Sequence, residues 1–141
     1  MSKGTFKEVG ESDQPMYGPK AMLVCGFTPS EQKTVMTLLE TIQLTDVPVI
    51  FAKDTDNGLC LGELLSLPDQ SGRDMDCGME RAVVLSGLTE KKFHQILTNY
   101  KTTELPRPLW ATLTPFSENW ILSNLLEELK KERIKMEKMN R

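Results

Sequence analysis

Apolar and polar positions follow the same order in two blocks of this chain. Residues 23–27 and 84–88 are each an apolar run interrupted by one glycine, and a threonine follows each run. An amphipathic stretch comes next, and then an apolar run that begins at Pro48 or Pro108. The two glycines are 61 residues apart (87 − 26) and the two prolines 60 (108 − 48). This near-constant spacing predicts a duplicated β-α-β unit.

Local signals predict the elements of each block. Thr28 suits a helix N-cap, Pro29 suits the first helical position, and Glu31 can close a capping box. Apolar residues then recur at helical spacing. We expect strands at 21–27, 47–52, 82–86 and 109–114, and helices that begin at Thr28, Thr89 and Thr114, the last continuing to near Asn140.

These elements predict an α/β fold in which the duplicated units form one four-stranded sheet with a long C-terminal helix. The first and third strands are apolar on both faces, which is typical of central strands. Residues 109–114 alternate as an edge strand does. The units can join as an open parallel sheet or in a ferredoxin-like order, with strand three antiparallel beside strand one. We expect both repeat helices on one face and the C-terminal helix at an edge or on the other face.

The predicted organisation is one domain behind a short arm. Residues 1–20 are polar and rich in glycine and proline, so we expect a disordered arm in which Met16 and Tyr17 touch the body. Residues 21–141 form a single α/β domain with repeats at 21–52 and 81–114. The connection at 53–80 holds seven acidic and two basic residues, and we expect a flexible loop at 68–78.

The amino-acid composition limits the classes of protein to which this chain can belong. With 141 residues and 39% hydrophobic residues the chain can bury a core, and its net charge of −3 disfavours nucleic-acid binding. Three cysteines indicate a reducing compartment. There is no apolar run of the roughly 20 residues that span a membrane, and no secretory signal. We expect an intracellular protein, in the plastid stroma if the source is a plant and otherwise in the cytoplasm.

Few residues favour catalysis or metal binding. His94 is the only histidine, and the spacing of the cysteines does not fit a zinc site. Acidic neighbours disfavour a thiolate at Cys77. The run that begins at Asp54 and Asp56 does not fit a calcium-binding EF-hand, because Leu65 stands where that loop needs glutamate. We therefore predict no catalytic residues, no metal and no cofactor, and favour a protein that is not an enzyme.

The two strand-to-helix turns are the candidate ligand site. Free amides at a helix N-terminus bind anions, so Gly26, Thr28, Gly87 and Thr89 could hold a small anion or a nucleotide. A phosphate-binding loop needs more glycines than these turns have. Glu31 would also repel an anion, so a purely structural role is favoured.

The chain's C-terminal third holds the candidate contact residues. Trp110 lies on the alternating strand, and Trp120 is expected to fix the last helix to the body rather than to face a partner. Four leucines of that helix recur at spacings of three and four, so we expect them to face the core: Leu122, Leu125, Leu126 and Leu129. Beyond Lys130 the helix is mostly charged, and Ile134, Met136 and Met139 could contact a partner protein or a second copy of the chain. A solvated helix end is the alternative for these three residues.

The quoted motifs resemble a family of uncharacterised proteins. Residues 16–19, 23–27, 82–88 and 110–115 are similar to a domain of unknown function with bacterial and plant members, the latter in plastids, and the resemblance is strongest over residues 81–133. It implies no activity and no site residues. The sequence therefore favours a non-enzymatic protein-interaction or regulatory module, with small-anion or nucleotide binding as the alternative.

Overall fold

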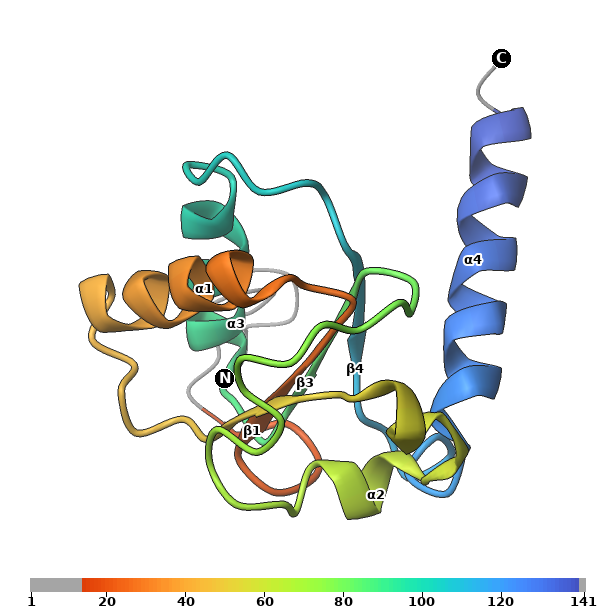
Figure 1. The fold of residues 1–141 in the computed structure, drawn as a ribbon, viewed down its shortest axis with the longest axis horizontal. Helices are drawn as coiled ribbons and strands as arrows, with labels where there is room; N and C mark the ends of the chain where they lie inside the picture. The colour runs from red at the N-terminus through yellow and green to blue at the C-terminus, as the bar shows by residue number, and fades with distance from the viewer. Residues whose placement is uncertain (1–13, 140–141) are drawn as a thin grey trace, which may run out of the picture.

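The computed structural model describes residues 14–139, with the side chain of Met139 left out. Figure 1 shows a central sheet flanked by helices, with the last helix rising beside it. In chain order the elements are β1 (Ala21–Cys25), α1 (Pro29–Thr41), β2 (Val49–Phe51), the 3-10 helix η1 (Asp54–Gly58), α2 (Leu61–Leu64), β3 (Ala82–Ser86), α3 (Glu90–Tyr100), β4 (Leu109–Thr112) and α4 (Leu122–Met139).

The α/β fold and the four-stranded sheet are confirmed, with strand order β2-β1-β3-β4. Each unit keeps its own two strands side by side and parallel, and β1 pairs with β3 antiparallel. The open parallel alternative was therefore wrong. Strand three lies antiparallel beside strand one, as the ferredoxin-like alternative required, while the two strands of each unit remain neighbours. The connection 53–80 returns the chain to the free side of β1, so the two units meet through their first strands.

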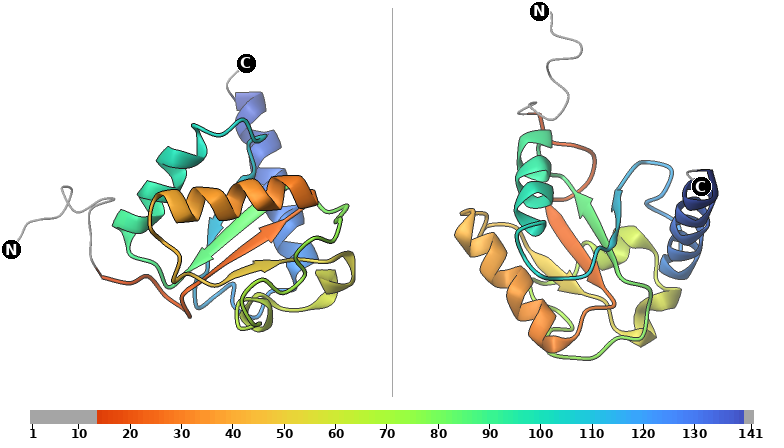
Figure 2. Two further views of the ribbon diagram at one scale, coloured as in Figure 1. Left: turned by 60° about the vertical axis from the view of Figure 1, so that its left-hand side comes forward. Right: turned by 90° about the horizontal axis from the view of Figure 1, so that it is seen from above.

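Helices cover both faces of the sheet. Figure 2 shows α1 and α3 together on one side and α4 on the other. Side chains of alternate strand residues separate accordingly, with Met22, Val24 and Val83 facing α1 and α3. Leu23 and Val84 face α2 and the start of α4. The expected positions of the repeat helices and of the C-terminal helix are confirmed, and all residues of the two central strands are buried.

The last helix begins eight residues later than its predicted start (122 − 114). Thr114 does cap a turn, since its hydroxyl oxygen accepts the Ser117 N–H at 3.1 Å. The chain then becomes extended: Leu61 N–H donates to Trp120 O at 3.0 Å, and Leu122 N–H donates to Leu59 O at 2.9 Å. This pairing with the segment before α2 takes the backbone groups that a continuous helix would need.

The two units have matching local geometry. Thr28 and Thr89 each follow a strand and cap a helix through the side-chain oxygen. Pairing keeps the same spacing, because Met22 pairs with Val49 and Val83 pairs with Trp110, in each case 61 residues further on (83 − 22, 110 − 49). Corresponding positions of the two units can therefore be compared directly. Their origin by duplication stays a prediction.

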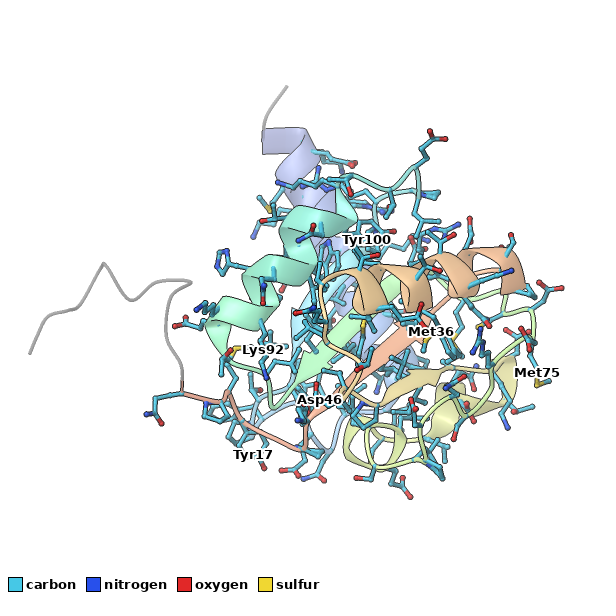
Figure 3. All side chains as sticks on the ribbon, turned by 90° about the vertical axis from the view of Figure 1, so that its left-hand side faces the viewer. Tyr17, Met36, Asp46, Met75, Lys92 and Tyr100 are labelled. Carbon is cyan, nitrogen blue, oxygen red and sulfur yellow. The ribbon has the colours of Figure 1, made fainter. Side chains whose placement is uncertain are left out.

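The segment before β1 lies against the body. Met16 N–H donates to Leu88 O at 2.8 Å, and Gly87 N–H donates to Tyr17 O at 3.1 Å. The expected contacts of Met16 and Tyr17 are thus present, and Figure 3 shows Tyr17 on this segment. Residues 15–20 form a strap against the body, and the disorder expected for residues 1–20 stays a prediction. Residues 1–13 lie outside the described part of the chain.

Candidate functional site

The predicted anion site at Thr28 is occupied by the chain's own groups. Thr28 N–H donates to the Glu31 carboxylate at 2.9 Å, and Glu31 N–H donates to the Thr28 hydroxyl oxygen at 3.3 Å. At the second turn, Lys92 N–H donates to the Thr89 hydroxyl oxygen at 3.1 Å. The caps therefore use donors that an anion would need.

Crossing backbone fills the space above both glycines. Gly26 and Gly87 have positive φ angles of 76° and 69°. A Cβ on Gly26 would lie 2.5 Å from Met79 O, and one on Gly87 would lie 2.6 Å from Gly18 O. In each case the segment that leads into one unit crosses the strand end of the other. This close approach accounts for the glycines without a ligand.

Charge at the first turn also disfavours an anion. Arg81 Nη1 lies 2.8 Å from Glu31 Oε1, and its guanidinium carbon lies 4.7 Å from the centre of the Phe27 ring. Hydrogen bonding to Arg81 lowers the pKa of the Glu31 carboxyl below its ordinary value. Glu31 is therefore a carboxylate at neutral pH, and it is already paired with the Arg81 guanidinium.

The acidic connection is anchored rather than free at several points. Gln32 is 1% exposed, and its side chain accepts the Asp74 N–H at 2.7 Å and donates to Met75 O at 3.1 Å. Gly78 N–H donates to the Asp54 carboxylate at 2.8 Å. These contacts anchor the middle and the C-terminal end of the loop at 68–78 that was predicted to be flexible. Its mobility stays a prediction that amide exchange can test.

No group of three or more His, Cys, Asp and Glu side chains within residues 14–139 is arranged to hold a metal ion. Cys25, Cys60 and Cys77 are free thiols. Burial raises the pKa of the Cys25 thiol, and burial is also the main cause that raises the pKa of Cys77. Neither is a reactive thiolate at neutral pH.

We expect Cys25 to resist alkylation in the native protein. Its side chain is fully buried and its pKa is raised, so both access and thiolate fraction are low. Iodoacetamide labelling at pH 7.5, read by mass spectrometry, should modify Cys60 without denaturant and Cys25 only after unfolding. Rapid native labelling of Cys25 would show that the sheet opens locally.

The predicted contact residues do not form one surface. Trp110 stacks edge-on against Tyr100, with ring centres 5.3 Å apart, and Figure 3 shows Tyr100 at the end of α3. Met136 lines a pocket that Trp110 also lines. Ile134 is two residues from Met136 and so lies on nearly the opposite side of α4. The side chain of Met139 lies outside the described part.

Trp120 does not fix α4 to the body as expected. Its side chain is 41% exposed, as are Ile121 at 40% and Phe116 at 85%. Leu122, Leu125 and Leu126 fix the helix instead, with exposed fractions of 0%, 6% and 8%. The predicted leucine face is thus confirmed, and the aromatic residues before it remain partly open to solvent.

The two edges of the sheet differ. At β2, the chain's own segment 69–71 covers the edge: Val49 N–H donates to the Asp69 carboxylate at 2.8 Å, Gln70 N–H donates to Val49 O at 2.6 Å, and Phe51 N–H donates to Ser71 O at 2.8 Å. Every residue of β2 is buried. This edge is closed to further pairing.

The edge of β4 is open. Leu109 and Leu113 donate to β3, so by alternation the N–H and C=O groups of Trp110 and Thr112 point outward. These residues correspond to Val49 and Phe51 in the first unit. Within residues 14–139 no hydrogen bond occupies their outward groups, and three of the four residues of β4 are only half-buried.

Two pockets flank this edge, one on each face of the sheet. The pocket beside α3 has a volume of about 550 Å³ and is lined by Leu97, Tyr100, Lys101, Thr103, Leu105, Arg107 and Trp110. The pocket beside α4 has a volume of about 570 Å³ and is lined by Arg107, Pro108, Leu109, Trp110, Leu129, Glu132, Arg133, Met136 and Glu137. Arg107 and Trp110 belong to both. We call the outward groups of Trp110 and Thr112 together with these pockets the β4 edge site.

Sequence reasoning found only part of the β4 edge site. It selected Trp110 and Met136 but missed Tyr100, Lys101 and Arg107. The available signal was the spacing of the two units, which relates Trp110 to Val49. That spacing could not show that residues 69–71 cover the β2 edge, because their position depends on how the connection 53–80 folds back.

Residues 81–136 match the family model of a domain of unknown function (DUF3783). This confirms the resemblance to an uncharacterised domain family. The matched region runs from just before β3 through most of α4 and includes every lining residue of the β4 edge site except Glu137. No curated protein and no solved structure matches the chain.

Proposed function

We propose that this protein is a non-enzymatic protein-interaction module and that the β4 edge site is its contact surface. The observation that supports this is the difference between the two edges. An uncovered strand edge is a template for pairing with another chain, and proteins normally protect such edges. Here the chain covers β2 with its own segment and leaves the corresponding groups of β4 unpaired.

The alternative, binding of a small anion or nucleotide at Gly26, Thr28, Gly87 and Thr89, has less support. Both caps use their amides internally, and crossing backbone approaches both glycines. A catalytic role has no supporting group of reactive side chains among the described residues. We also propose a reducing compartment on the basis of three free cysteines, the plastid stroma if the source is a plant. No helix within residues 14–139 is long and apolar enough to cross a membrane.

Amide exchange should distinguish the two edges in the free protein. We expect the amides of Val49 and Phe51 to exchange slowly, because they are hydrogen-bonded, and those of Trp110 and Thr112 to exchange quickly. Hydrogen–deuterium exchange followed by NMR measures each amide. Slow exchange at Trp110 and Thr112 in a monomer would contradict an open edge.

A substitution at Thr112 tests the contact surface. Thr112→Pro removes an outward N–H while leaving the inner bonds of Leu109, Ala111 and Leu113 intact, and edge strands tolerate proline. Thr112→Val keeps the N–H and the side-chain shape. In affinity capture, the Thr112→Pro variant should lose the specific partner and the Thr112→Val variant should retain it. Equal capture by both variants would refute the β4 edge site as the contact surface.

A further inference from the structure

We infer that the β4 edge site binds an extended acidic segment of a partner protein, which adds to the sheet as a fifth strand. This inference rests on the proposed function and specifies the partner's chemistry. It combines three features of the site: the unpaired backbone groups, the two cations of the pocket beside α3, which has no acidic lining residue, and the apolar side chains of the pocket beside α4.

The first unit shows how such a segment sits. Residues 69–71 run along β2 in the same direction, since Gln70 contacts Val49 and Ser71 contacts Phe51. Asp69 accepts the Val49 N–H through its carboxylate. A partner segment that makes the corresponding bonds would donate to Trp110 O and accept from the N–H groups of Trp110 and Thr112. Main-chain bonds of this kind supply affinity in strand addition.

Charge on the α3 face selects acidic side chains. Lys101 and Arg107 line that pocket, which has no acidic lining residue. Neither cation is in an ion pair within the described part of the chain. Tyr100 and Trp110 form the adjoining wall. An Asp or Glu of the partner would therefore find two unpaired cations beside the open strand.

The α4 face selects apolar side chains. Leu109, Leu129 and Met136 form its apolar part. Its charged residues balance, two basic (Arg107 and Arg133) against two acidic (Glu132 and Glu137), and Arg133 already contacts Glu80 at 3.3 Å, so this face attracts neither sign of charge. Successive side chains of a strand point to opposite faces of a sheet. The preferred segment should thus alternate acidic residues, toward α3, with aliphatic residues, toward α4. A phosphate polymer lacks the N–H donors that Trp110 O and Thr112 O require, so the open strand favours a peptide.

Peptide selection tests the inference. A phage-displayed library of random dodecapeptides would be panned on the full-length protein, and the consensus peptide synthesised together with a version in which amides replace its acids. We expect a consensus of alternating acidic and aliphatic residues. Fluorescence anisotropy should show binding at least about tenfold weaker for the amide version, for Lys101→Glu/Arg107→Glu and for Thr112→Pro. Thr112→Val, which keeps the N–H, should bind more tightly than Thr112→Pro, and the exposed α3 substitution Lys91→Glu should leave the affinity unchanged.

Four other results would overturn the inference, and each can be distinguished from the rest. The selected consensus peptide could lack acidic residues and still lose its binding to the Thr112→Pro variant. That result would refute the acidic partner while supporting an interaction module. Peptide or poly-glutamate binding that Thr112→Pro leaves intact would refute strand addition. Sedimentation that shows a dimer sensitive to Thr112→Pro would mean that a second copy occupies the edge. If no peptide, copy or captured protein responds to Thr112→Pro, the proposed function fails as well.

Discussion

Gly87→Ala is expected to destabilise the protein by about 3 kcal/mol or more. Two costs add. A non-glycine residue in the left-handed region costs roughly 1–2 kcal/mol, and Gly87 has a φ of 69°. The new Cβ would also lie 2.6 Å from Gly18 O and 2.6 Å from Lys20 N, and overpacking of this kind costs roughly 1–3 kcal/mol. Urea denaturation followed by circular dichroism measures the loss.

The matching geometry of the two units sharpens this prediction. Gly26→Ala should cost a similar amount, because Gly26 has a φ of 76° and its Cβ would lie 2.5 Å from Met79 O. Gly58→Ala is the control: nothing lies within 4 Å of its Cβ, so we expect a change within about 0.5 kcal/mol. Equal stability of Gly58→Ala and Gly87→Ala would show that the strap does not cross Gly87 this closely.

Leu122→Ala is expected to cost about 2–5 kcal/mol, the range for emptying a packed leucine site. Leu122 is fully buried and belongs to the core between the sheet, α2 and the start of α4. Its N–H also donates to Leu59 O, so the cavity would lie where α4 joins the body. Thermal and urea unfolding should both report the loss.

Ile134→Ala provides the comparison within the same helix. Ile134 is 41% exposed and lies beyond the packed leucines, so we expect a change of no more than about 0.5 kcal/mol. Truncation after Arg133 should likewise leave the fold stable. A large loss of stability on either change would mean that the second half of α4 packs against the body.

An open β4 edge carries a risk of aggregation that the structure offsets only in part. Unpaired strand edges favour aggregation, and proteins usually cover, shorten or charge them. The four-residue length of β4 and the nearby Lys101 and Arg107 limit this tendency. A bound acidic segment would cover the edge and neutralise both cations, which is consistent with a surface that is used only in a complex.

Local sequence predicted the parts of this protein that depend on neighbouring residues. Thr28 and Glu31 form the expected capping box with Pro29 at the first helical position, because these groups meet within one turn. Apolar spacing identified the buried leucines of α4, and uninterrupted apolar runs identified β1 and β3 as central strands. These features follow from the periods of helix and strand alone.

Contacts between distant segments decided the rest. The strand order depended on how residues 53–80 return to β1, and the start of α4 depended on Leu59 and Leu61 taking the backbone groups of residues 120–122. The β4 edge site likewise exists because residues 69–71 cover β2 while no described segment covers β4. The spacing of apolar residues does not indicate which segments pair, because the hydrogen bonds of a sheet can join residues at any separation in the chain. The sequence thus determined the two units and their buried faces, and only the tertiary structure decided which edge of the sheet is left open.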